Sequence, residues 1–161
     1  MNTSDKIHKN LDSLLPLVGA WKAQGHKIVF TNGCFDLLHL GHVDYLEKAR
    51  NLGDKMVVGL NTDASVQGNK GTDRPITDEV SRARVLAALQ FVDAVILFDE
   101  DTPYLLICQV QPDILVKGKD YAVKDIVGAD FVMNQGGKVE TIELVSGYST
   151  SGIVNKIKKQ K

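Results

Sequence analysis

The chain has 161 residues, of which 43% are hydrophobic and 24% are charged, and its net charge is −1 at pH 7. This length and composition suit one globular domain with a sizeable core. A near-neutral charge argues against a nucleic-acid or membrane-surface partner, and no apolar run is long enough to span a bilayer. The two cysteines, Cys34 and Cys108, are too few for a disulfide framework. We therefore expect a cytoplasmic protein with no nucleic-acid or membrane partner.

The first 26 residues predict a helical segment. Asn2 to Asp5 offer N-cap side chains, Pro16 is expected to kink or split the helix, and Gly25 predicts its end. Apolar residues recur between them at helical spacing: Ile7, Leu11, Leu14, Leu15 and Val18. Because nothing in residues 1–26 carries chemistry, we assign them to packing or dimer contacts and residues 27–161 to the functional domain.

Residues 27–52 predict a strand, a loop and a helix. The apolar run Ile28 to Phe30 precedes a turn over Thr31 to Asp36. One face of the following helix is then expected to carry Val43, Leu46, Ala49 and Leu52. A helix N-terminus has free N–H groups and a partial positive charge, so it is a natural phosphate site. Gly33 and Gly41 leave room for a close approach of ligand to backbone.

His39 and His42 lie three residues apart, so they share one face of the first helical turn. As imidazolium groups they could stabilise the charge that builds on a phosphate during displacement. Two alternatives are that one ring caps the helix while the other packs, or that Cys34, Asp36 and both histidines bind zinc. The spacing matches no standard zinc pattern. We therefore favour phosphate chemistry without a resident metal.

The rest of the chain alternates between strands and helices, which predicts a parallel α/β sheet. The expected strands cover residues 55–60, 92–98, 113–116 and 138–142, and the expected helices cover residues 77–89, 104–109, 128–134 and 153–158. The chain has neither G-x-G-x-x-G nor G-K-[ST] in the required context, so dinucleotide dehydrogenases and P-loop NTPases are disfavoured.

Polar residues follow the strand at 55–60. Asn61 and Asp63 come directly after it, at the edge where parallel sheets bind ligands. The glycine-rich stretch over residues 67–75 is then either a plain surface loop or a mobile flap. As a flap it would carry Lys70 and Arg74 toward phosphates and open to release product.

Two later stretches add polar groups to the same expected site. Gly118 and Asp120 follow the strand at 113–116, again on the ligand side. Ser149, Thr150 and Ser151 open the last helix, where hydroxyls serve either as N-caps or as phosphate ligands. Opposite a second phosphate-binding helix end, we favour contact with a triphosphate.

The stretch T-N-G-C-F-D-L-L-H-L-G-H resembles the signature of the cytidylyltransferase-like nucleotidyltransferases, whose hallmark is H-x-G-H. The resemblance extends from about Lys27 to Lys156. Within that superfamily the chain is most similar to the heptose 1-phosphate adenylyltransferases. The similarity continues through R-P-I, V-D-A-V-I-L-F-D-E-D-T-P, L-V-K-G-K-D-Y and G-Y-S-T-S. Glycerol 3-phosphate cytidylyltransferases share the first and last motifs but are less similar between them.

The resemblance implies a Rossmann-like, doubly wound sheet and transfer of AMP from ATP to a sugar 1-phosphate. The products would be an ADP-sugar and pyrophosphate, with Mg²⁺ bridging the triphosphate, for the heptose of lipopolysaccharide-type polymers. It also implies a separate upstream heptose kinase and a homodimer. The alternatives are a cytidylyltransferase for glycerol 3-phosphate or another polyol phosphate, and a nucleotide-binding module without catalysis.

The resemblance also implies roles for individual residues. The expected catalytic residues are His39, His42 and Lys70. The expected nucleotide- and phosphate-binding residues are Thr31, Asn32, Gly33, Cys34, Phe35, Gly41, Arg82, Gly118, Asp120, Ser149, Thr150 and Ser151. The expected acceptor-binding residues are Asp36, Asn61, Asp63 and Arg74. Lys119 stands where the family usually has glycine, and Ser151 where it usually has threonine.

Overall fold

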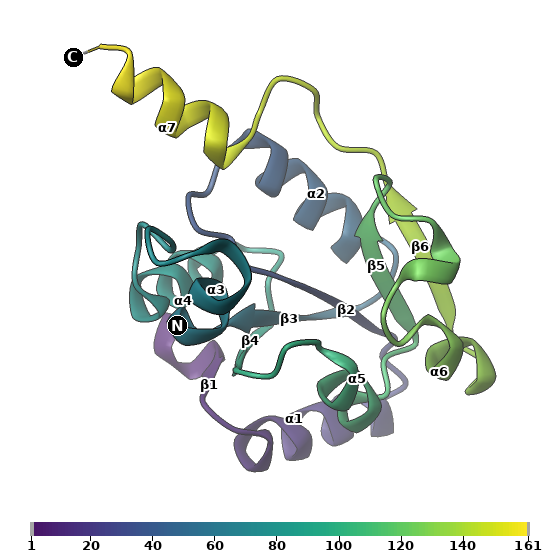
Figure 1. Ribbon diagram of the computed structural model, residues 1–161. Coiled ribbons are helices and arrows are strands. Elements are labelled where there is room, and N and C mark those ends of the chain that lie inside the picture. The colour runs from purple at the N-terminus through teal and green to yellow at the C-terminus, as the bar shows by residue number, and fades with distance from the viewer. Residues whose placement is uncertain (1, 161) are drawn as a thin grey trace.

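Six parallel strands form one sheet in the computed structural model, which describes residues 2–160 (Figure 1). The strands are β1 (Ile7–His8), β2 (Ile28–Gly33), β3 (Lys55–Asn61), β4 (Ala94–Phe98), β5 (Ile114–Gly118) and β6 (Lys138–Ile142). Their order across the sheet is β1-β4-β3-β2-β5-β6, with every neighbouring pair parallel. The predicted Rossmann-like α/β fold is therefore confirmed.

The order in which the chain fills the sheet reverses at β2, which pairs with β3 on one side and β5 on the other. Pairing with β3 continues to Gly33, opposite Leu60. Pairing with β5 ends earlier, at Phe30 opposite Leu115. Open α/β sheets bind ligands outside the carboxyl ends of their strands at such a reversal. The carboxyl ends of β2 and β5 are therefore where this fold leaves room for a ligand.

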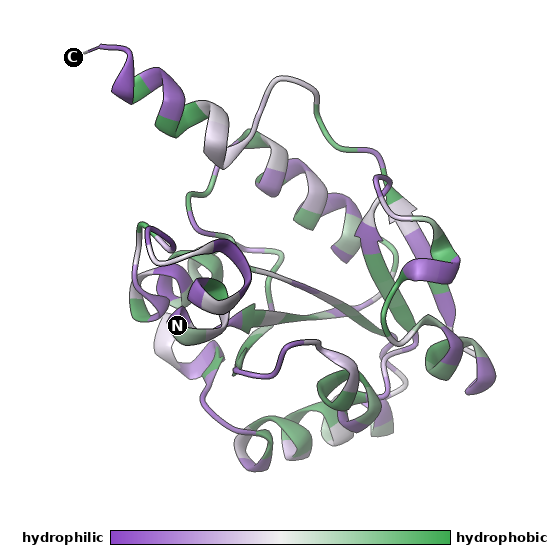
Figure 2. Ribbon diagram, viewed as in Figure 1, coloured by the Kyte–Doolittle hydropathy of each residue, from purple (hydrophilic) through white to green (hydrophobic). Residues whose placement is uncertain are grey.

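Helices cover both faces of the sheet (Figure 1). They are α1 (Leu11–Ala23), α2 (Leu40–Arg50), α3 (Asp63–Lys70), α4 (Glu79–Ala88), α5 (Tyr104–Val110), α6 (Ala129–Asn134) and α7 (Thr150–Lys158), with 3-10 turns at Thr3–Lys6 and Val123–Asp125. Phe30 and Leu115 pack with α1, α5 and α6, on what we call the α1/α5 face. Val29 and Val116 pack with α2 and α4, on the α2/α4 face. Figure 2 shows apolar residues along the strands and along α1.

The N-terminal segment differs from the predicted single helix. Ile7 lies on strand β1, which pairs with β4, and α1 begins only at Leu11 after the N-cap Asn10. Helix α1 continues through Pro16 without splitting. Gly25, with φ +81°, follows the helix end as predicted. Because α1 packs in the core on the α1/α5 face, residues 2–26 belong to the same domain as the rest of the chain.

Two helix boundaries after β2 and β3 also differ from the prediction. The stretch expected to be a loop from residue 67 is instead helical as far as Lys70, because α3 begins after the N-cap Thr62 and buries Val66. The weak helix formers Gly68 and Asn69 concealed this helix in the sequence. Helix α2 ends at Arg50, so Leu52 falls in the next turn and is 40% exposed instead of lying on the apolar helix face.

Helix α7 extends away from the body of the domain, and its N-terminus lies beside that of α2 (Figure 1). The segment before it contacts α2, because a Cβ placed on Gly41 would lie 3.4 Å from Cβ of Tyr148. Of the helices in residues 2–160, none has the length and apolar character needed to cross a membrane.

Candidate active site

A cleft of about 560 Å³ lies at the carboxyl ends of β2, β3 and β5. The N-termini of α2 and α7 both border it. Most of the residues predicted for the site line this cleft: Asn32, Gly33, Cys34, Phe35, Asp36, His39, Gly41, His42, Asn61, Lys70, Arg74, Gly118, Asp120, Ser149, Thr150 and Ser151. The fold thus brings together segments from five separate parts of the chain.

The N-terminus of α2 places the two histidines in the cleft. His39 is the N-cap residue in extended conformation, and its carbonyl accepts hydrogen bonds from the N–H groups of His42 (2.9 Å) and Val43 (3.2 Å). A Cβ on Gly41 would lie 3.1 Å from the His39 ring. A glycine is therefore needed in the first turn so that the His39 ring can fold back against the helix.

The imidazole rings of His39 and His42 stack, with centroids 3.8 Å apart and planes 19° apart. The edge-on ring of Phe35, whose φ is +43°, packs against His42 at 5.2 Å. Nδ1 of each histidine is buried and lacks a hydrogen bond of normal geometry to any group in residues 2–160. The rings are thus held by packing, and their polar capacity is largely unused.

Both histidines are neutral near pH 7 in this arrangement. Burial lowers the pKa of His42 to about 4, aided by the charges of His39 and Lys70 and opposed by the Leu37 carbonyl. Burial also lowers the pKa of His39. The imidazolium pair considered from the sequence is therefore not the resting state. The neutral rings offer N–H donors, and a bound polyanion would raise their pKa values.

Asp36 lines the cleft, but its carboxylate is already occupied. It accepts hydrogen bonds from Arg74 Nε (2.7 Å) and from the backbone N–H groups of Ile76 (2.8 Å) and Thr77 (3.0 Å). Burial alone would raise the pKa of Asp36, but these bonds outweigh it and lower the pKa. With its side chain only 1% exposed, Asp36 braces the loop after α3 instead of presenting a free carboxylate to an acceptor.

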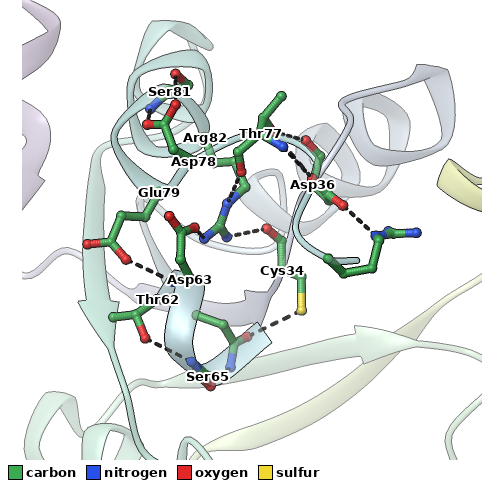
Figure 3. Close-up of polar contacts among 12 residues, drawn as sticks. Cys34, Asp36, Thr62, Asp63, Ser65, Thr77, Asp78, Glu79, Ser81 and Arg82 are labelled. Atoms are coloured by element: carbon green, nitrogen blue, oxygen red, sulfur yellow. Dashed lines mark hydrogen bonds and ion pairs between the residues drawn. The ribbon is translucent and has the colours of Figure 1, made fainter. Parts of the chain in front are cut away.

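Arg82 and Asp63 do not line the cleft; they form a second brace, with the loop after β2 (Figure 3). The fully buried Arg82 side chain donates to the Cys34 carbonyl (2.7 Å), the Asp63 carboxylate (2.7 Å) and the Thr77 carbonyl (3.0 Å). In this structure Arg82 and Asp63 hold neighbouring segments in place, and their contact with a ligand stays a prediction. The brace ties the loop after β2 to the start of α3 and of α4.

Thr31 is the third predicted residue that does not line the cleft. It is fully buried, and its hydroxyl lies 2.7 Å from that of Tyr45, which donates to the Val116 carbonyl. Since Thr31 points to the α2/α4 face, its side chain joins α2 to the sheet. Strand alternation alone would have indicated this, because Val29 points the same way.

Asn61 and Ser149 line the cleft while making contacts of their own. The Asn61 amide donates to the Ser65 hydroxyl (2.9 Å), and its oxygen faces the Cys34 thiol at 3.9 Å. The Ser149 hydroxyl caps α7 by accepting from the Gly152 N–H (3.0 Å). The capping alternative for Ser149 thus holds in this structure. Phosphate contact by Ser149 and Thr150 stays a prediction.

Several lining residues were not expected from the sequence, among them Asn69, Asp101, Tyr121 and Tyr148. The most informative is Lys117, the only charged residue in the apolar strand β5. Its Nζ donates to the Asn32 carbonyl at 3.2 Å, and burial lowers its pKa to about 8. The sequence did offer a signal for this residue, because Lys117 stands in an otherwise apolar strand, directly before the glycine at its carboxyl end.

Residues 30–156 match the family described as cytidylyltransferase-like. The chain is 60% identical over 154 residues to "Bifunctional protein HldE" of Methylobacillus flagellatus, covering 96% of this chain and 31% of that protein. It is 57% identical over 158 residues to the protein of the same name from Magnetococcus marinus, covering 98% and 32%. The chain therefore spans about a third of the length of these curated relatives.

Two solved structures are also similar. The lipopolysaccharide core biosynthesis protein from Thermoplasma volcanium GSS1 has 33% identity and a TM-score of 0.61, over 78% of this chain and 100% of that one. Pantoate-beta-alanine ligase from Francisella tularensis has 19% identity and a TM-score of 0.64, over 95% of this chain and 77% of that one. At that identity the ligase supports the fold alone.

Proposed function

The chain belongs to the cytidylyltransferase-like family of nucleotidyltransferases, and on that premise we propose that it transfers AMP from ATP to heptose 1-phosphate. The products are an ADP-heptose and pyrophosphate. The observation that carries the proposal is the convergence of two helix N-termini and the His39–His42 pair on one cleft at the sheet reversal. The similar structure named a lipopolysaccharide core biosynthesis protein supports a sugar of that polymer as the acceptor, and the motif resemblance specifies heptose.

The reaction needs few protein groups. A phosphate oxygen of the sugar attacks the α-phosphorus of ATP, the bond from that phosphorus to the bridging oxygen breaks, and pyrophosphate leaves with the electron pair. A sugar phosphate is already anionic near pH 7, so no general base is required. The protein contributes positioning and charge stabilisation. His39, His42 and the N–H groups of α2 supply donors at the place where charge builds up.

We propose that Mg²⁺ reaches the cleft bound to ATP. Residues 2–160 contain no group of three or more His, Cys, Asp or Glu side chains placed to hold a metal ion. Mg²⁺ would take its ligands mainly from phosphate oxygens and water, its usual mode with nucleotides. It would then enter the cleft with ATP and offset the charge of the triphosphate.

We further propose that a heptose kinase acts upstream, because the acceptor must carry a phosphate on C1. A homodimer is the expected assembly, since symmetric dimers are the commonest oligomers. Size-exclusion chromatography with light scattering measures the mass directly. A monomeric mass at working concentration contradicts the dimer but leaves the proposed reaction unaffected.

The test is pyrophosphate release with Mg²⁺, crossing ATP and CTP against heptose 1-phosphate and glycerol 3-phosphate. The proposal expects turnover only with ATP and the heptose. Turnover with CTP and glycerol 3-phosphate would replace it with the polyol phosphate reaction and direct attention to Lys119. ATP binding without release in any combination would favour a nucleotide-binding module.

A further inference from the structure

Lys117 belongs to a different face of the sheet from the histidine pair. Leu115, two positions earlier on β5, packs in the α1/α5 cluster, whereas Val116 packs in the α2/α4 cluster. Alternation along the strand therefore directs Lys117 toward the α1/α5 face. Asn32 lies on the same face, since a Cβ on Gly59 would lie 3.1 Å from Cβ of Asn32 and 3.2 Å from Cδ2 of Leu106 on α5. The cleft thus has two polar walls.

The ammonium group of Lys117 lacks a counter-ion. Its Nζ donates to the Asn32 carbonyl at 3.2 Å and lies 5.9 Å from the centroid of the Tyr121 ring. Within residues 2–160, no carboxylate oxygen forms an ion pair with it at 4 Å or less. An ammonium group has three N–H donors, so most of its donor capacity is unused. Oδ1 of Asn32, beside it, is buried and also unpartnered.

Keeping a cation half-buried without an anion is unfavourable. Burial accordingly lowers the pKa of Lys117 to about 8, with the charges of Cys34 and Asp120 opposing the shift. The other cations of the cleft are differently placed, since Lys70 is exposed and Arg74 is paired with Asp36. Lys117 is therefore the cation whose surroundings are completed by an anionic ligand.

The proposed reaction brings two anions into the cleft. The triphosphate is matched by the α2 N-terminus, the α7 N-terminus and the histidines, which lie on the wall formed from the α2/α4 face. The second anion is the phosphate of the acceptor, which must approach the α-phosphorus from the side opposite the leaving pyrophosphate. Lys117 and Asn32 stand on the wall formed from the α1/α5 face, apart from the groups that match the triphosphate.

We propose that Lys117 Nζ binds the phosphate group of the acceptor, with the Asn32 amide beside it, and so positions the attacking oxygen. This inference rests on the proposed function, since it assigns that reaction's second substrate to one wall of the cleft. A purely structural lysine, holding the Asn32 carbonyl, is the competing explanation. The two differ in what they predict for acceptor binding at fixed nucleotide occupancy.

The test measures binding without turnover. The protein is saturated with an ATP analogue whose α- and β-phosphorus atoms are joined by a methylene group, so pyrophosphate cannot leave. Heptose 1-phosphate is then titrated by calorimetry into wild type, Lys117→Met and Lys117→Arg. Lys119→Met is the matched control, because Lys119 is an exposed lysine only two residues away. Its Nζ lies 3.8 Å from a carboxylate oxygen of Glu143.

We expect Lys117→Met to weaken acceptor binding about tenfold or more, the effect of one charged hydrogen bond, while affinity for the analogue stays within about twofold. Lys117→Arg is expected to retain most of the acceptor affinity, and Lys119→Met all of it. In wild type, acceptor affinity should fall as the pH rises through about 8, and Lys117→Arg should remove this fall. Equal losses for analogue and acceptor, or no loss for either, overturn the proposal.

A second titration separates this inference from the proposed function. If wild type does not bind heptose 1-phosphate, the proposed acceptor is wrong, and inorganic phosphate is titrated by NMR into the same nucleotide-loaded protein. A phosphate site present in wild type and Lys119→Met but lost in Lys117→Met supports the lysine's role. Phosphate binding that is absent from wild type, or unchanged in Lys117→Met, overturns it. Thermal unfolding confirms that each variant is folded.

Discussion

The loop after β2 and the histidine pair beside it border the same cleft but use their polar groups in opposite ways. Asp36 in the loop and Arg82, which holds the loop from α4, each make three or more hydrogen bonds or ion pairs, and both side chains are almost completely buried. The rings of His39 and His42 are stacked yet leave buried nitrogen atoms without partners. The polar groups of the first region already bind the backbone and one another, whereas those of the histidine pair are available to bind a ligand.

This difference predicts opposite consequences for substitution. Changes in the braced loop should reduce the free energy of unfolding, and activity should fall because the loop moves. Changes in the histidine pair should reduce activity while the fold is retained.

The largest effect is expected for His39→Ala and His42→Ala. Each removes a donor at the place where negative charge builds up, so turnover should fall by about a hundredfold or more. Pyrophosphate release under saturating substrates measures it. Because neither Nδ1 has a normal hydrogen bond in the described residues, the melting temperature should change little. Near-normal turnover in both variants would contradict the proposed mechanism.

Arg82→Met should lower the free energy of unfolding by about 2 kcal/mol. This loss is smaller than the usual effect of breaking a fully buried ion pair, because the Asp63 side chain is 33% exposed. The substitution leaves the Cys34 and Thr77 carbonyls without their donor. Urea unfolding measures the change. Arg84→Met is the control, since Arg84 is exposed on the same helix. Equal stability of the two variants would mean that the brace is not a source of stability.

Stability should also depend on pH through His42. Its folded-state pKa of about 4 lies below the ordinary value of 6.5, so between these values the unfolded chain binds more protons. Stability is then full above pH 6.5 and decreases as the pH falls toward 4, by about 1 kcal/mol or more. Urea unfolding of wild type and His42→Phe across this range tests it. An equal slope in both proteins would assign the pH dependence to other groups.

The smallest effect is expected for Asp36→Asn, which keeps the shape of the side chain but removes its charge. A loss of about 1 kcal/mol is expected at pH 7, because the amide oxygen can still accept from the Ile76 and Thr77 N–H groups, whereas the amide nitrogen cannot accept from Arg74 Nε. The carboxyl's lowered pKa means that its contribution is present above its unfolded pKa and is lost as the pH falls through the folded value. Wild type and variant should therefore converge in acid. A constant difference would contradict this.

The parts of the fold that are encoded locally were predictable. Strand β2, the turn after it and helix α2 follow one another in a single stretch, and their apolar pattern, glycines and histidines are all visible there. Strand β1 was not predictable, because a strand of two residues exists only through its pairing with β4. Helix α3 was missed because burial of Val66 against the sheet outweighs the poor helix formers near its end.

The composition of the cleft was predictable, but the division of labour within it was not. The sequence shows that Asp36, Asp63 and Arg82 are polar residues near the ligand edge. It does not show that these side chains bind groups in other segments. The loop after β2 and the starts of α3 and α4 come together only in the folded chain. The same reason explains Lys117, whose significance depends on Asn32, a residue 85 positions away.

The early end of pairing between β2 and β5 has a mechanical consequence. Beyond Phe30 and Leu115 the two strands no longer pair, although β2 remains paired with β3 up to Gly33. The cleft therefore lies where two neighbouring strands in the middle of the sheet separate, and the Lys117–Asn32 hydrogen bond spans the gap between them. A substrate bound there contacts both strands and so links the two halves of the sheet. Occupancy should slow amide exchange along β2 and β5 together, whichever wall it touches first.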